Sequence, residues 1–120
     1  MGASKVLTFQ IKGQNKVLVQ RCVMADSLHS RLVGLLNHQS LDEGEGMLIT
    51  SCNQVHTLFM RFAIDAIFLS ADWEVLAIRE LKPWRLSPLV WKSKSVLEVP
   101  FGVSKKFGLK VGDQLEPLPS

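Results

Sequence analysis

The chain has 120 residues, of which 47% are hydrophobic and 21% charged, a balance that excludes a disordered chain and is typical of a single globular domain over residues 1–120. The formal net charge of +3 makes the chain only mildly basic, and without a nucleic-acid motif this argues against nucleic acid as a partner. No apolar run reaches the roughly 18 residues that a membrane span requires.

Residues 1–10 contain no continuous apolar stretch, because apolar and polar residues alternate after Lys5. We therefore expect no signal peptide and a cytoplasmic protein, although the mature form of an exported protein would look the same. Apolar and polar residues alternate over 6–11 and again over 16–23, with the turn-forming residues 13–15 between them. This pattern predicts a β-hairpin.

One main α-helix is predicted over about 27–37. Asp26 and Ser27 are candidate N-caps, and the apolar residues that follow recur at helical spacing, namely Leu28, Leu32, Leu35 and Leu36. The apolar face of this helix would pack against a sheet.

The segment 55–69, V-H-T-L-F-M-R-F-A-I-D-A-I-F-L, is where His, Thr, Arg and Asp are threaded through a long apolar run. A helix would align its polar residues, which are spaced by four, but we interpret it as one long strand, because Phe, Ile, Val and Thr are abundant in it. The segment is longer than a typical strand, so we expect a bend or bulge near Ala63. Its even positions are nearly all apolar, so alternation places Thr57, Arg61 and Asp65 together on the opposite face. His56 lies on the apolar face, where it would be a core histidine unless a bulge shifts the register.

The remaining patterns predict short elements. They are strands over 47–50, 75–80, 94–99 and 114–116, an irregular basic loop between the middle two, and a helical turn within 102–109. Six or seven strands with one main helix predict a mainly β, α+β fold. We expect an antiparallel, partly closed sheet or barrel with the main α-helix packed against it.

Several ordered motifs are similar to those of a known family. They are Arg31-Leu-Val-Gly34-Leu-Leu36, Gly46-Met47-Leu48, His56-Thr57, Met60-Arg61-Phe62, Ile64-Asp65, Phe68-Leu69, Val96-Leu97-Glu98, Gly102 and Gly112-Asp113. Over about residues 17–115 the chain resembles the family catalogued as domain of unknown function 192. The resemblance implies a small β-rich domain with one helix. It implies no established activity, so it supplies no catalytic residue and no cofactor.

The candidate ligand-binding residues are Arg31, His56, Thr57, Arg61, Asp65 and Glu98. Arg61 and Asp65 would anchor an anionic or hydroxyl-rich ligand, or else form a structural ion pair. Arg31 would point into the same cleft or bridge to Glu98. The three histidines lack the spacing of zinc ligands, so no metal site is predicted. The two cysteines, Cys22 and Cys52, match no zinc or redox motif, and we expect them to be free thiols.

Three functions follow from these patterns. The preferred one is a monomeric, non-enzymatic binding module for a small polar ligand or a partner peptide, which uses the polar face of segment 55–69. The second is a hydrolase in which Asp65 or His56 acts as the base and Arg61 stabilises charge. The third is a protein-interaction subunit that uses the basic loop 82–94 and its two tryptophans, Trp84 and Trp91.

Overall fold

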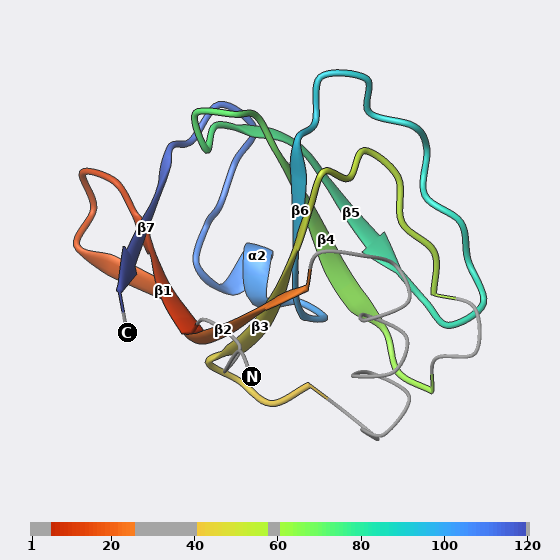
Figure 1. The fold of residues 1–120 in the computed structure, drawn as a ribbon. Helices are drawn as coiled ribbons and strands as arrows, with labels where there is room; N and C mark the ends of the chain where they lie inside the picture. The colour runs from red at the N-terminus through yellow and green to blue at the C-terminus, as the bar shows by residue number, and fades with distance from the viewer. Residues whose placement is uncertain (1–5, 26–40, 58–60, 120) are drawn as a thin grey trace, which may run out of the picture.

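The structure, a computed structural model, describes residues 6–25, 41–57 and 61–119. Within these ranges the chain forms seven strands and one short helix (Figure 1). These are β1 Val6–Ile11, β2 Lys16–Ala25, β3 Glu45–Thr50, β4 Ile64–Leu69, β5 Val75–Leu81, β6 Ser95–Pro100, α2 Val103–Lys106 and β7 Leu115–Pro119. The short strands and the helical turn were predicted close to these positions. The predicted helix over 27–37 lies outside the described residues.

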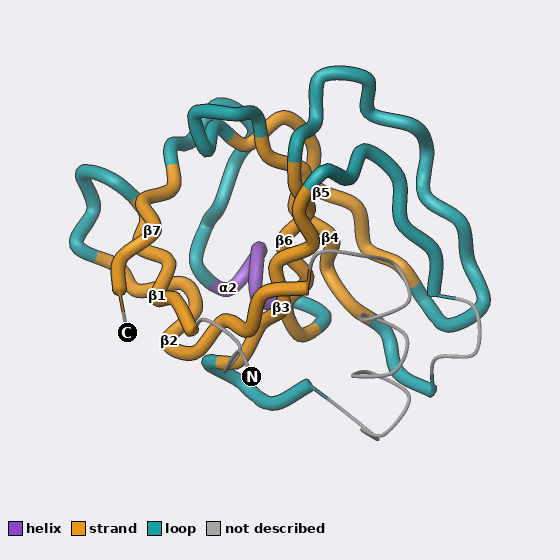
Figure 2. Tube along the Cα trace, viewed as in Figure 1, coloured by secondary structure: helices purple, strands orange, loops and turns teal. Residues whose placement is uncertain are grey.

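The strands form one sheet in the order β5-β4-β6-β3-β2-β1-β7. The sheet curls into a half-barrel around α2, which lies on its concave side (Figures 1 and 2). The prediction of a purely antiparallel sheet was wrong, because β2 pairs with β3 in parallel. A parallel pair needs a long crossover connection, and residues 26–44 between these strands supply one.

Both faces of the central strands are buried, which divides the core into two clusters. The inner cluster fills the half-barrel and includes Ile67, Leu97 and Val103 of α2. The outer cluster lies on the opposite face and includes Ala66 and Phe68. All six residues of β4 are therefore buried.

Two long loops cover the outer face. One follows β3 and is called loop 51–63, of which residues 58–60 lie outside the described part; the other follows β5 and is called loop 82–94. Val55 belongs to the outer cluster, and Phe62 and Val90 pack against it. In Figures 1 and 2 the two loops run beside each other along the sheet. The outer sheet face is consequently a platform on which the loops are fixed.

The prediction of one strand over 55–69 was wrong for its first part, and the break in it lies next to Ala63, where a bend or bulge was expected. β4 begins only at Ile64, and residues 55–57 lie in loop 51–63, where His56 makes an isolated bridge to Leu86. The strand alternation that placed Thr57, Arg61 and Asp65 on one face therefore does not apply. No described helix is long and apolar enough to cross a membrane.

Candidate functional site

Thr57 joins the two loops. Its hydroxyl donates a hydrogen bond to the carbonyl oxygen of Lys82 at 2.5 Å and accepts one from the backbone N–H of Arg85 at 2.8 Å. Its own N–H donates to the carbonyl oxygen of Arg85 at 2.7 Å, and its carbonyl oxygen accepts from the N–H of Trp84 at 2.8 Å. The side chain is 0% exposed. Thr57 thus acts as a buried clamp at the start of loop 82–94.

The pairing continues along both loops. The N–H of Ser87 donates to the carbonyl oxygen of Val55 at 2.9 Å, and the N–H of Val55 donates to the hydroxyl of Ser87 at 3.0 Å. Further along, the N–H of Val90 donates to the carbonyl oxygen of Asn53 at 2.9 Å. Because its backbone is bonded at these points, loop 82–94 is held along loop 51–63.

Apolar side chains are exposed along this fixed loop. Within the described part of the chain, seven large hydrophobic residues are exposed, and four of them belong to loop 82–94. Their exposed fractions are 54% for Trp84, 65% for Leu86, 40% for Leu89 and 80% for Trp91. Scattered exposed apolar residues are normal on a protein surface, whereas a concentration in one segment marks an interaction site.

The backbone at Trp84 adopts a left-handed conformation with φ +63°. This region is unfavourable for a bulky side chain, and residues held there cluster at functional sites because the surrounding structure must enforce them. The bond from the N–H of Trp84 to Thr57 is part of that enforcement. The fold thus holds the backbone of an exposed tryptophan in a conformation of unfavourable energy.

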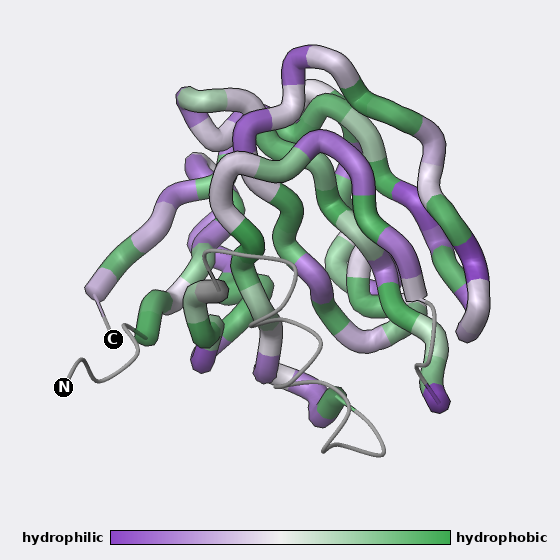
Figure 3. The backbone as a smooth tube through the Cα atoms, turned by 45° about the vertical axis from the view of Figure 1, so that its right-hand side comes forward, coloured by the Kyte–Doolittle hydropathy of each residue, from purple (hydrophilic) through white to green (hydrophobic). Residues whose placement is uncertain are grey.

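Charge is also segregated onto the two loops. Together, residues 51–63 and 82–94 contain five of the fourteen Lys and Arg residues and none of the eleven Asp and Glu residues. All five cations are exposed, namely Arg61, Lys82, Arg85, Lys92 and Lys94. Figure 3 shows hydrophilic and hydrophobic residues interspersed along both loops. The rest of the chain then has two more acidic than basic residues. The exposed apolar side chains of loop 82–94 are therefore accompanied by positive charge and by no negative charge on the two paired loops.

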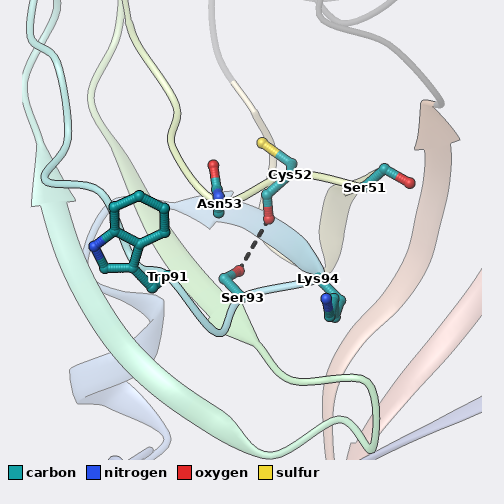
Figure 4. Close-up of a pocket in the computed structure, with 6 residues that line it drawn as sticks. All are labelled: Ser51, Cys52, Asn53, Trp91, Ser93 and Lys94. Atoms are coloured by element: carbon teal, nitrogen blue, oxygen red, sulfur yellow. Dashed lines mark hydrogen bonds between the residues drawn. The ribbon is translucent and has the colours of Figure 1, made fainter.

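A pocket of about 290 Å³ opens beside the end of loop 82–94. Figure 4 shows its lining, which is Ser51, Cys52, Asn53, Trp91, Ser93 and Lys94. The hydroxyl of Ser93 donates to the carbonyl oxygen of Cys52 at 3.0 Å, and in Figure 4 the thiol of Cys52 points away from this hydroxyl. The pocket is a polar hollow bordered by an exposed indole.

Asp65 has a structural position. Its side chain is 0% exposed, and its two carboxylate oxygens accept hydrogen bonds from the backbone N–H groups of Gly102 at 3.2 Å and Ser104 at 3.0 Å. Gly102 caps α2 at φ +90° and provides no side-chain cap of its own, so Asp65 supplies the acceptors that the first N–H groups of the helix need.

The other sequence candidates do not converge on Asp65. Arg61 is exposed, and no ion pair between described residues joins it to Asp65. His56 is half-buried in loop 51–63. Glu98 is 0% exposed in β6, where its register neighbours are Met47 and Ala66 on the outer-cluster face.

Arg31, and with it the predicted bridge to Glu98, lies outside the described residues. The assignment of ligand binding to the six candidates remains a prediction.

A second hollow, of about 280 Å³, lies between β5 and α2. It is lined by Ile78, Glu80, Ser104, Lys105 and Leu109, with an ion pair of 3.4 Å between Glu80 and Lys105. The hydroxyl of Ser104 is buried and has no hydrogen-bond partner among the described residues. A buried hydroxyl of this kind is commonly satisfied by an ordered water molecule.

The two thiols differ in environment, and neither is part of a disulfide. Burial raises the pKa of the Cys22 thiol to about 12, because a thiolate would lose its hydration there. Cys52 is half-buried beside the polar pocket, and its thiol donates to the carbonyl oxygen of Gln54 at 3.1 Å. Cys22 is therefore part of the core, and Cys52 is the more accessible thiol.

The tryptophans and cations of loop 82–94 were predictable from the sequence, but the exposed Leu86 and Leu89 were not. An apolar residue in a sequence is normally assigned to the core, so composition alone could not identify them. The signal that was available is the absence of acidic residues from 51–63 and 82–94.

The chain is similar in sequence to several known proteins. The family model DUF192, described as "Uncharacterized ACR", matches residues 8–117. A UPF0127 protein of Pyrococcus furiosus is 45% identical over 62 residues, which are 52% of this chain and 53%, or about half, of that relative. A UPF0127 protein of Thermococcus sibiricus is 28% identical over 109 residues, which are 88% of this chain and 71% of the relative.

Two crystal structures share the fold at low sequence identity. A protein of unknown function from Novosphingobium aromaticivorans superposes with a TM-score of 0.79 at 23% identity, covering 92% of this chain and 84% of that one. A proposed transcription regulator of Sinorhizobium meliloti gives a TM-score of 0.77 at 20% identity, covering 96% and 94%. At these identities the likeness shows a common architecture.

Proposed function

Since the chain belongs to the DUF192 family, whose description assigns no activity, we propose from its surface that the protein is a binding module which recognises its partner through loop 82–94. The observation that carries this proposal is the concentration of exposed apolar side chains on that loop. Tryptophan and arginine are the residues that most often dominate binding energy at interfaces, and both are present here.

The backbone pairing of the loop supports the same function. Binding costs free energy when a flexible segment must be ordered, and a segment that is already fixed avoids most of that cost. Thr57 and Ser87 fix loop 82–94 through buried side-chain hydrogen bonds. The loop is thus organised for contact before any partner arrives.

The alternative sites offer less to a partner. The hydroxyl of Thr57 and both carboxylate oxygens of Asp65 are already engaged with backbone groups. A hydrolase that uses Asp65 as its base would need this carboxylate to reach a substrate, and the side chain is 0% exposed. The predicted polar face of segment 55–69 is accordingly the weaker candidate for the binding surface.

Site-specific photo-crosslinking tests the proposal, because it captures whatever molecule contacts the loop. A photoreactive phenylalanine analogue replaces Leu86, which is 65% exposed, or Val111, which is 64% exposed and lies far along the chain. In cells that express the protein, we expect a discrete adduct from position 86 and none from position 111. The same adducts from both positions, or none from position 86, would contradict the proposal.

A further inference from the structure

Building on the proposed function, we infer that loop 82–94 docks on the surface of an anionic lipid bilayer. Its exposed apolar side chains would enter the headgroup region, and its cations would contact lipid phosphates. This is attachment to one face of a membrane by a loop. The inference names the partner chemistry of the site proposed above and depends on that site.

The apolar side chains fit the membrane interface. Tryptophan is enriched at the boundary between headgroups and acyl chains, because its large ring is apolar and its N–H remains able to hydrogen bond. Trp91, the most exposed of the apolar side chains at 80%, and Leu86, at 65%, have no role in the described core. Insertion into the interface would remove both from water.

The cations flank the exposed leucines of the loop in the sequence. Lys82 and Arg85 are on one side of the apolar centre of the loop, and Lys92 and Lys94 are on the other. All four are exposed, and no acidic residue of either paired loop would meet the lipid phosphates. The two excess negative charges of the rest of the chain would favour the orientation in which these loops face an anionic surface.

The composition favours lipid over the other macromolecules. Single-stranded nucleic acid would use the indoles for stacking and the cations for phosphates, but it gives no role to Leu86 and Leu89. Protein interfaces are depleted in lysine, and their binding hot spots are poor in leucine. Loop 82–94 presents two exposed leucines and three lysines together with its tryptophans. A bilayer interface accommodates all of these residue types at once.

Vesicle flotation tests the inference with the full chain. The probes are vesicles of phosphatidylcholine with 40% phosphatidylglycerol and vesicles of phosphatidylcholine alone, with a single-stranded oligonucleotide as the competing ligand. We expect partition into the anionic vesicles only, weakened at high salt because screening reduces the attraction. The fluorescence of Trp84 and Trp91 should shift to shorter wavelength. A variant in which both are replaced by Phe retains only the half-buried Trp73 and should show no shift.

Matched variants assign the effect to the loop. Leu86→Ser should lower the partition coefficient about tenfold, whereas Val111→Ser, at nearly the same exposure, should not change it. The pair Lys82→Ala and Lys92→Ala should lower it by about fivefold per cation, and the pair Lys12→Ala and Lys16→Ala should have a much smaller effect. All six side chains are exposed, and thermal unfolding verifies that each variant is folded.

Three results overturn the inference. They are no partition into anionic vesicles at low salt, equal partition into both vesicle types, and equal loss from the loop and control variants. If the protein does not bind the vesicles but position 86 crosslinks to a protein or to a nucleic acid, the bilayer is wrong and the proposed function stands. If the protein does not bind the vesicles and position 86 gives no adduct, both the inference and the proposed function are wrong.

Discussion

Replacing Thr57 by valine separates a structural clamp from a ligand contact. Valine matches the shape of threonine but cannot hydrogen bond, so the substitution removes one bond to the carbonyl oxygen of Lys82 and one from the N–H of Arg85. A buried group that loses its partner costs about 1–3 kcal/mol. Because Lys82 and Arg85 are exposed residues, water can replace part of each bond.

We therefore expect Thr57→Val to lower the free energy of unfolding by about 2 kcal/mol, which corresponds to a fall in Tm of about 8 °C for a chain of this size. Urea denaturation followed by tryptophan fluorescence measures the change. Thr57→Ser retains the hydroxyl and should lose less than half as much. Thr8→Val provides the control, since the hydroxyl of Thr8 makes one exposed bond of 3.0 Å to the carbonyl oxygen of Gln20.

The substitution should also loosen loop 82–94. The N–H groups of Trp84 and Arg85 bond to Thr57, so their hydrogen exchange should accelerate in the valine variant while that of the β4 core does not. A Thr57→Val protein with unchanged stability and unchanged exchange at these two groups would refute the clamp. Thr57 would then again be a candidate ligand contact.

Three further outcomes are expected. Asp65→Asn should cost about 2–3 kcal/mol in urea denaturation, because one amide oxygen cannot accept both backbone bonds at the start of α2, and a cost below about 0.5 kcal/mol would contradict that role. Arg61→Ala should change the same free energy by less than about 0.5 kcal/mol, since the side chain is exposed; a loss of several kcal/mol would instead indicate a buried ion pair. At pH 8 a disulfide reagent should modify Cys52 first, and Cys22 should react only after unfolding, because its folded pKa is raised from 9.0 to about 12. As an unfolded thiol ionises first, stability should fall as pH rises above about 9, and rapid reaction of both thiols in the folded protein would refute the burial of Cys22.

Sequence alone located most of the strands. The hairpin of β1 and β2 was predicted because one face of each strand is apolar and the turn between them is rich in turn-forming residues. The same reasoning failed on β4, which is buried on both faces. Ile67 and Leu69 enter the inner cluster while Ala66 and Phe68 enter the outer one, so the apolar pattern contains no alternation that could mark where the strand begins.

The parallel pairing of β2 and β3 was also missed by the reasoning from sequence. A strand, a predicted helix over 27–37 and a second strand follow one another in the sequence, which is the order of a parallel crossover unit. Apolar periodicity assigns elements but contains no information about which strands become neighbours, so the antiparallel sheet was assumed.

The candidate site was predicted only in part. Thr57 and Asp65 were identified because polar groups in apolar surroundings must be satisfied, and the structure shows both bonded to the backbone. The sequence could not identify their partners, since Lys82 and Gly102 are brought to them only by the folded sheet. The exposure of Trp84 and Trp91 likewise depends on how loop 82–94 lies across the outer face.

The pairing of β1 with β7 has a consequence for how the protein is made. Leu7 is the register partner of Pro119, and Ile11 that of Leu115, so the first strand receives its second neighbour from the far end of the chain. Contacts between residues so distant in sequence slow folding, because a long loop must close before they form. During translation the inner cluster stays open along β1 until the last strand has left the ribosome. The exposed edge of β1 would then be the part of the nascent chain most in need of protection from aggregation.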